Sequence, residues 1–322
     1  MSELRIRPAY DDDDAEIALI NALNRPEYAL GISDLRAMRA LDTERYHSAM
    51  FAAVMPTTEG ERVVGAAWYG QPPDLYEPGV WWMTLLVHPA HTRRGVGSAL
   101  FSHAVASLGP YHPVTLKANV REDRLNAVAF AQRRGFVEYW RRWGAALDLS
   151  DFEPERWRDR MTPRHPHIVI RDLAELMRQD PDAGRKLHAL QTRLDANVPL
   201  PDPITVLSYE QYEEFFLRNP QFLLEGTMVA LHDGRYIGMS SFMVGGDGSR
   251  LDVDLTGVLP EYRGYGVALA LKLRGLAWAL ANGYQRVAVQ NDPVNAPMLA
   301  INDKLGFVRQ PALLRMKRSP LP

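Results

Sequence analysis

A chain of 322 residues, of which 46% are hydrophobic and 24% charged, has the length and composition of a globular protein with two cores. Its net charge of −2 excludes a general attraction to nucleic acid or to an anionic membrane. The absence of cysteine excludes disulfides, thiolate metal ligands and a cysteinyl acyl intermediate. With no run of 18 apolar residues and no signal-peptide core near the N-terminus, we expect a cytoplasmic protein.

The first half of the chain opens with a predicted strand at 4–7, followed by four acids, Asp11 to Asp14, and a segment of helical periodicity at 15–23. Four neighbouring acids allow a metal-site interpretation. Acids in the first turn of a helix also complement its dipole, and this second interpretation is favoured.

Further strands are predicted at 62–68 and 80–87, and the second of them leads into a glycine turn and a helix that reaches 101. An alternating aromatic and polar stretch at 136–149 is typical of a strand and closes this half. The charged segment 151–166 contains three prolines and is the predicted linker.

The second half opens with a predicted strand at 168–170 and two helical segments at 172–177 and 183–196. Three prolines at 197–203 predict an extended loop. This loop either shapes an acceptor site or is a structural connection.

A strand, a tight glycine turn and a helix are then predicted between 251 and 281. Apolar residues alternate at 251–255, the turn contains Pro260, Gly264 and Gly266, and helical spacing resumes at Val267. Such a turn directs backbone N–H groups and the positive end of the helix dipole to one point, which favours a diphosphate. A purely structural connection would give the same pattern.

The two halves repeat one another. Matching pairs separated by 171 positions are Val87 and Val258, Pro89 and Pro260, Gly95 and Gly266, and Gly135-Phe136 and Gly306-Phe307. Several matches at one separation indicate a duplication. We therefore predict an N-terminal domain at 1–150, a linker at 151–166 and a C-terminal domain at 167–322.

The spacing Arg263-x-x-Gly266-x-Ala268 resembles the acyl-CoA loop of the GNAT superfamily of N-acyltransferases, and the segment from Asn291 to Leu305-Gly306-Phe307 resembles the family's next motif. The resemblance implies a tandem GNAT protein of α/β class, in which each domain has a mixed central sheet flanked by helices. It also implies acetyl-CoA or another acyl-CoA as co-substrate and no metal.

Family positions for acyl-CoA contacts can be carried onto both halves. In the second half they are Val258, Arg263, Gly264, Tyr265, Gly266, Val267, Ala268, Asn291 and Asn295. In the first half they are Val87, Arg93, Arg94, Gly95, Val96, Gly97 and Ser98. The first half departs from the pattern, because Thr92 replaces Arg263, and Val120 and Arg124 replace the two asparagines.

The family often places a base on the strand before the loop and a tyrosine four residues before the Gly-Phe pair. Asp252, Asp254 and Thr256 alternate on that strand and are expected on one face. Asp254 is the candidate base, although a solvated strand face explains the same pattern. Asn302 and Ala131 stand at the tyrosine positions, so neither half has that general acid.

Two other groups of residues are open to more than one interpretation. Four histidines, His88, His91, His103 and His112, surround the first loop but lack metal-ligand spacing, so surface histidines are the preferred interpretation. The run 139–143 mixes aromatics with arginines, and alternation on a strand is favoured over a nucleic-acid surface.

We therefore expect transfer of an acyl group from acyl-CoA to a small-molecule primary amine, by a monomer or homodimer without nucleic-acid or membrane partners. The alternative is a non-catalytic acyl-CoA sensor or interaction protein.

Overall fold

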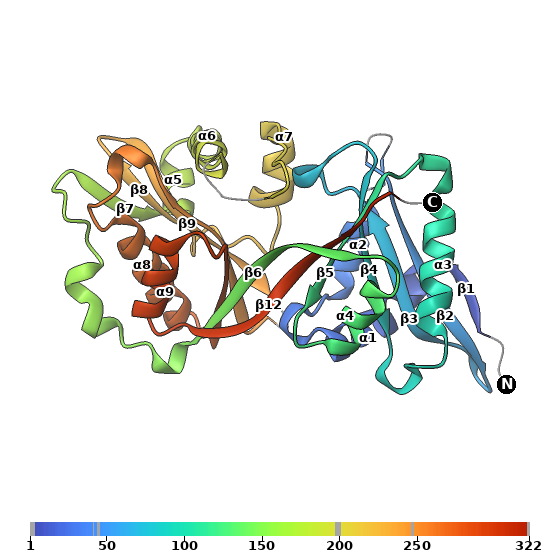
Figure 1. The fold of residues 1–322 in the computed structure, drawn as a ribbon. Coiled ribbons are helices and arrows are strands. Elements are labelled where there is room, and N and C mark those ends of the chain that lie inside the picture. The colour runs from blue at the N-terminus through green and yellow to red at the C-terminus, as the bar shows by residue number, and fades with distance from the viewer. Residues whose placement is uncertain (1–3, 41, 44–45, 197–200, 246–247, 321–322) are drawn as a thin grey trace. The chain divides into compact units, whose positions relative to one another are not determined.

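A computed structural model describes residues 4–40, 42–43, 46–196, 201–245 and 248–320. Part of the proline-containing loop expected at 197–203, residues 197–200, lies outside these ranges. The chain forms two compact units (Figure 1). Unit 1 comprises Met1–Arg141 and Leu313–Pro322, and unit 2 comprises Arg142–Ala312. In the residues that the structure describes, no helix combines the length and apolar character needed to span a bilayer.

Unit 1 is a layer of strands with helices on both faces. Its strands follow the order β1-β2-β3-β4-β5-β12, and β4 and β5 are parallel. The elements are β1 (Arg5–Pro8), α1 (Asp14–Asn24), α2 (Ile32–Ala40), β2 (Ser48–Thr57), β3 (Gly60–Gly70), β4 (Val80–Val87), α3 (Val96–Leu108), β5 (Thr115–Arg121), α4 (Leu125–Gln132) and the later part of β12 (Val308–Arg318).

The two faces of the unit 1 sheet are covered by different helices. Ile17 and Ile20 of α1 and Leu35 of α2 pack against one face, on Ala66 and Trp68 of β3. A Cβ added to Gly65 of β3 would meet α3 side chains, which places α3 on the opposite face. This three-layer arrangement is the α/β fold predicted from the sequence.

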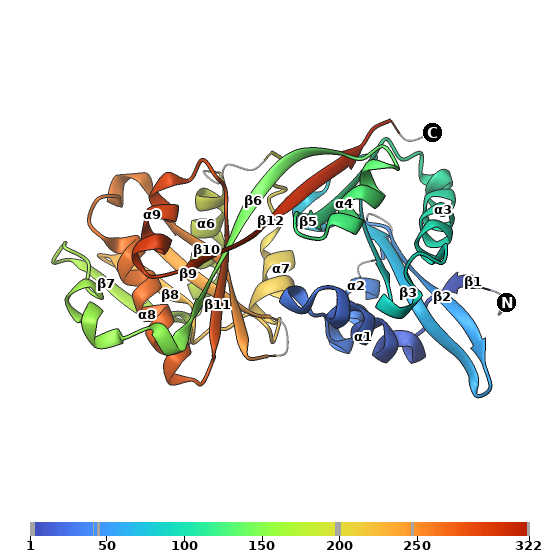
Figure 2. The same cartoon turned by 60° about the horizontal axis from the view of Figure 1, so that its bottom comes forward.

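Unit 2 repeats this plan, with strand order β6-β11-β10-β9-β8-β7 and parallel β10 and β11 (Figure 2). The elements are β6 (Val137–Asp148), β7 (Ile168–Asp172), α5 (Leu173–Gln179), α6 (Ala183–Asp195), α7 (Tyr209–Tyr212), a π-helical turn (Glu213–Leu217), β8 (Met228–His232), β9 (Arg235–Gly245), β10 (Arg250–Val258), α8 (Val267–Ala281), β11 (Arg286–Asn291) and α9 (Ala296–Lys304).

Glycines on the central strands of unit 2 allow helices to pack closely on each face. A Cβ on Gly257 of β10 would lie 2.9 Å from Leu194 of α6, and one on Gly238 of β9 would lie 3.4 Å from Leu271 of α8. Since Gly238 pairs with Val258, the residue after Gly257, the two helices lie on opposite faces.

Each repeat contributes its last strand to the sheet of the other unit. Residues 143–148 of β6, from the first repeat, pair with β11 of unit 2. Residues 313–318 of β12, from the second repeat, pair with β5 of unit 1. The compact units therefore do not coincide with the repeats that predicted domains at 1–150 and 167–322.

Residues 151–166 fold against unit 2, although most of them are exposed. They contain a 3-10 helix at Pro154–Arg160, and Phe152, Trp157 and Met161 pack with the core beneath α8. The Arg274 guanidinium on α8 donates from Nε to the carbonyl of Met161, at 2.9 Å. The segment predicted as a linker is therefore attached to unit 2 by a few apolar residues, while its charged side chains are exposed.

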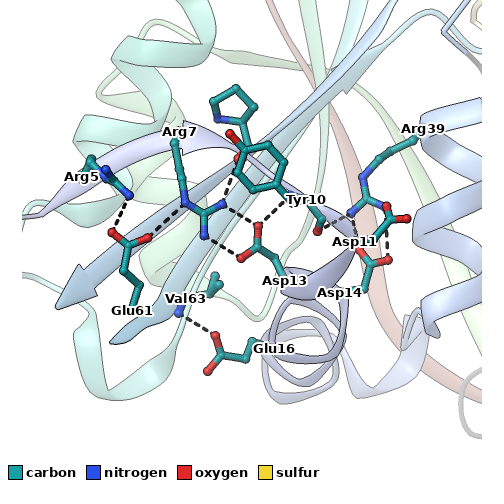
Figure 3. Close-up of polar contacts among 11 residues, drawn as sticks. Arg5, Arg7, Tyr10, Asp11, Asp13, Asp14, Glu16, Arg39, Glu61 and Val63 are labelled. Carbon is teal, nitrogen blue, oxygen red and sulfur yellow. Dashed lines mark hydrogen bonds and ion pairs between the residues drawn. The ribbon is translucent and has the colours of Figure 1, made fainter. Parts of the chain in front are cut away.

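Three of the four acids at 11–14, Asp11, Asp13 and Asp14, are bound by arginines (Figure 3). Asp13 accepts two hydrogen bonds from Arg7, at 2.7 and 2.8 Å, and one from the backbone N–H of Tyr10. Asp14 is buried and pairs with Arg39 of α2. The Arg7 guanidinium and the N–H of Tyr10 lower the pKa of Asp13 although burial opposes them. These acids thus fasten α1 to β1 and α2.

Candidate functional site

In both units, the two parallel strands at the centre of the sheet part to form a fork. In unit 2, β10 pairs with β11 only at Arg250 to Asp252. In unit 1, β4 pairs with β5 only at Val80 to Trp82. Beyond these points the strands diverge, and the edge of β10 or β4 that faces the fork leads directly to the glycine loop. An extended ligand that lies in such a fork could pair with this strand edge.

The two glycine loops have the same backbone conformation. Gly264 and Gly266 have φ of 85° and 78°, and the matching residues Arg93 and Gly95 have φ of 61° and 85°. Gly266 and Gly95 precede the first residues of α8 and α3. Alternating left-handed residues at a helix N-terminus form a concave set of N–H groups that suits a phosphate. Both loops therefore have a backbone geometry that suits a phosphate group.

Side chains of the loops have mainly structural contacts. Val267 and Val96 are buried in their cores, while Ala268 packs on the core of unit 2. The Nε–H of Arg263 points to the carbonyl of Val258, at 3.4 Å. In unit 1, the Ser98 hydroxyl accepts from Arg134 at 2.8 Å. Ligand contacts from these predicted residues would therefore come chiefly from their backbone.

β10 contains a bulge between Val253 and Thr256, which places Asp254 in the open fork. The Ser241 hydroxyl of β9 donates to Asp254 at 3.0 Å, whereas Ser240 contacts Thr256 at 2.9 Å. Because Ser240 and Ser241 are adjacent on β9, these contacts lie on opposite faces. The expectation that Asp254 and Thr256 share a face is wrong, since the extra residue of the bulge reverses the alternation.

Asp252 lies in the paired part of β10 and has a different environment. Its carboxylate accepts from Arg250 at 2.6 Å, and burial raises its pKa despite this arginine. Asp254 is exposed and lies where the fork is open. Position therefore favours Asp254 as the carboxylate that an incoming substrate could reach.

The asparagines predicted to contact acyl-CoA are fixed by local bonds. Asn291 ends β11, and its Oδ1 accepts from the buried Asn302 Nδ2 at 2.5 Å. Asn295 caps α9, where its Oδ1 accepts from the N–H of Met298 at 3.4 Å. Asn302, at the position of the family tyrosine, thus orients Asn291.

Unit 1 has the fork and the loop but a different reactive strand. Its β4 pairs with β3 in unbroken register, without a bulge. The carbonyl of Val87 accepts from Asn24 at 3.0 Å. A cavity of about 560 Å³ beside the fork is lined by aromatic and apolar residues such as Trp68 and Trp82, together with charged residues that include Asp42 and Arg315. Unit 1 thus has space at the fork but no carboxylate matching Asp254.

Histidines near the first loop have local roles. His88 Nδ1 accepts from the N–H of Ala90 at 3.2 Å, and burial lowers the pKa of His91. Across the described ranges, no group of three or more histidine, aspartate and glutamate residues is arranged to hold a metal ion.

Sequence reasoning missed Ser241 and the bulge at Asp254. Two adjacent serines in the otherwise apolar strand β9 were a usable signal for the first, because hydroxyls in a core strand need a partner. The bulge had no signal, since an extra residue in one strand is defined only by the register of its partner.

Comparison with known proteins identifies both repeats. Residues 17–136 and 190–307 each match the family described as "Acetyltransferase (GNAT) family", and together they cover more than half of the chain.

Related proteins include mycothiol acetyltransferases of several bacteria. That of Thermobispora bispora is 27% identical over 311 residues, which are 95% of this chain and 96% of the relative. That of Cellulomonas flavigena is 27% identical over 235 residues, which are 70% of this chain and 63% of the relative, less than two thirds of its length.

Solved structures of similar fold include a tandem GNAT protein and GCN5-related proteins. A "Tandem GNAT protein from the clavulanic acid biosynthesis pathway" has a TM-score of 0.77, with 22% identity and 99% coverage of both chains. A GCN5-related N-acetyltransferase from Sphaerobacter thermophilus has a TM-score of 0.66, with 16% identity and coverage of 99% and 96%. At these identities the structures support the fold, while the two sequence matches show that the chain belongs to the acetyltransferase (GNAT) family, with one family domain in each repeat.

Proposed function

We propose that unit 2 transfers an acetyl group from acetyl-CoA to a small-molecule primary amine. The observation that carries this assignment is the open fork of unit 2, which combines a phosphate-binding loop with a reachable carboxylate, Asp254. Unit 1 has an open fork and a loop of the same conformation, but it lacks the carboxylate. We therefore assign chemistry to unit 2 and a weaker or structural acyl-CoA site to unit 1.

The reaction follows from this placement. Acyl-CoA lies along the edge of β10, with its diphosphate on the loop before α8 and its thioester near the bulge. Asp254 accepts a proton from the acceptor amine, directly or through water, before or while its nitrogen attacks the thioester carbon, and Ser241 orients the carboxylate. The new N–C bond replaces the C–S bond, and CoA leaves as a thiolate. Backbone N–H groups near Val258 polarise the thioester carbonyl.

Departure of CoA needs little help from the protein. A thiol has a pKa of about 8.5, so its thiolate is a tolerable leaving group near neutral pH. Asn302, which replaces the family tyrosine, is bonded to Asn291 and serves positioning. The proposal therefore has a general base and no side-chain general acid.

The acceptor is proposed from the relatives. Amines related to mycothiol are the first to test, because the relatives carry that name. Identities of 27% leave other acceptors open, so a broad amine panel is required.

The test combines calorimetry with an assay of released CoA. Titration with acetyl-CoA gives the number of sites per chain, and a thiol reagent then reports free CoA in the presence of each amine. One or two sites with amine-dependent CoA release support the proposal. Binding without release with any amine would favour the alternative sensor function, and no binding to acetyl-CoA or longer acyl-CoAs would contradict both.

A further inference from the structure

Arg164 lies against the glycine loop of unit 2, although it comes from the segment before β7. Its backbone N–H donates to the carbonyl of Tyr265 at 2.9 Å, and its Nη2 donates to the carbonyl of Gly264 at 3.2 Å. A Cβ built on Gly266 would be 3.8 Å from Arg164 Nε. The guanidinium thus lies against the backbone of the loop whose N–H groups form the proposed phosphate site.

The segment that carries Arg164 is fixed on both sides of this residue. Upstream, Arg274 binds the carbonyl of Met161. Downstream, the His165 ring makes an edge contact with the Tyr265 ring, at 5.1 Å between centroids. A side chain held this way loses less conformational entropy when a ligand binds.

The loop of unit 2 carries fewer arginines than the loop of unit 1. The loop of unit 1 carries Arg93 and Arg94, whereas the matching residues of unit 2 are Gly264 and Tyr265. The remaining loop arginine, Arg263, directs its Nε–H to the carbonyl of Val258. Arg164 therefore restores, from a distant part of the chain, a positive charge that the loop itself has lost.

We propose that Arg164 binds phosphate oxygens of the acyl-CoA in unit 2. The inference rests on the proposed function of that unit. A guanidinium has five N–H donors, and the bond to Gly264 uses one of them, so the group can hold the loop and still donate to a phosphate. The coenzyme offers two sources of phosphate oxygen, the diphosphate and the 3′-phosphate.

The test measures dissociation constants of the full chain by calorimetry with acetyl-CoA, acetyl-dephospho-CoA and acetyl-pantetheine. In Arg164→Ala, the dissociation constant for acetyl-CoA should rise about 10- to 100-fold, as expected for loss of a charge-assisted bond. Acetyl-pantetheine, which has no phosphate, should bind both proteins equally. Arg164→Lys should recover part of the affinity, because a charge remains without the planar fork.

Arg160→Ala is the matched control, since Arg160 is exposed on the same segment. It should leave all three constants within about twofold. A loss that persists with acetyl-dephospho-CoA assigns the diphosphate as the partner of Arg164, and a loss confined to acetyl-CoA assigns the 3′-phosphate.

Two results would overturn the inference while the proposed function stands. The first is an unchanged or lower dissociation constant for acetyl-CoA in Arg164→Ala, which would mean that the side chain is a bystander or blocks the site. The second is an equal loss of affinity for acetyl-pantetheine, which would indicate structural damage. If the unsubstituted chain binds none of the three compounds, the proposed function fails as well.

Discussion

The two glycine loops have one backbone conformation and different residues, and this contrast shows what the duplication has preserved. Arg93 adopts the left-handed conformation that Gly264 adopts in unit 2, at a cost of about 1 kcal/mol for a residue with a side chain. The strands that lead into the loops differ in both backbone and side chains. β10 has a bulge and a carboxylate, while β4 is regular and apolar at the matching position. The units thus share the backbone of the loop and differ in the side chains of the strand that precedes it.

The largest expected effect comes from an acidic residue in one loop or the other. Gly266→Glu places a side chain at positive φ and a negative charge in the phosphate site, so acetyl-CoA turnover should fall roughly a thousandfold, or about 4 kcal/mol. Gly95→Glu is the matched variant of unit 1 and should change turnover by less than about threefold. Steady-state assays of CoA release would show this, and equal losses would contradict the assignment of chemistry to unit 2 alone.

Next in size is the effect of removing the base. Asp254→Asn should lower kcat about a hundredfold at neutral pH, with an unchanged KM for acetyl-CoA, because the amide cannot accept the proton. Ser241→Ala should have a smaller effect in the same direction. Met83→Leu, at the matching position of unit 1, is the control and should be neutral. An unchanged kcat in Asp254→Asn would remove this residue from the mechanism.

A third difference lies in the cores. Lys272 of α8 is 3% exposed and its Nζ lies 5.4 Å from the centre of the Phe307 ring, whereas the matching Phe101 packs on Phe136. Burial lowers the pKa of Lys272 to about 7. Between pH 7 and the ordinary lysine pKa, the unfolded chain holds the extra proton, so the free energy of unfolding should rise with pH.

Lys272→Met tests this pH dependence. The difference in unfolding free energy between variant and unsubstituted protein should shrink by about 2 kcal/mol from pH 7 to pH 9, with the variant the more stable at pH 7. Urea titrations at several pH values would measure it. Lys304→Met, at an exposed lysine of α9, is the control and should show no such trend. If the unfolding free energies of Lys272→Met and of the unsubstituted protein change with pH in parallel, the buried lysine is not neutral.

The smallest expected effect concerns the loop backbone. Arg93→Gly should stabilise the protein by up to about 1 kcal/mol, because glycine adopts positive φ without strain. Gly264→Arg should destabilise it by a similar amount. The urea concentration at the midpoint of unfolding measures both changes, provided that the slope of the unfolding free energy against urea concentration is the same in each protein. Shifts of the same sign would show that the two loops do not share a conformation in solution.

Local features of this fold are predictable from the sequence. The strand predicted at 80–87 is β4, and the helix predicted to begin at Val267 is α8. Both follow from apolar periodicity that ends at proline and glycine. The duplication was equally visible, because matched residues recur at one separation, and the family match confirms it.

Features that depend on distant partners were not predictable. The alternation at 136–149 indicates a strand, yet it carries no information on which sheet receives the strand. Arg164 meets a loop about 100 residues further along the chain, and nothing near Arg164 in the sequence marks that loop as its partner. The bulge that separates Asp254 from Thr256 depends likewise on the register with β9.

Because each repeat gives its last strand to the other unit, the two units complete their strand pairing at different times during translation. β5 receives β12 as its neighbour, and the ribosome makes the β12 residues nearly 200 residues after β5. At about 5–20 residues per second, the edge of β5 waits on the order of 10–40 s for that neighbour. An open strand edge is a template for pairing with other chains. The half of the protein that is translated first is therefore the half that completes its sheet last.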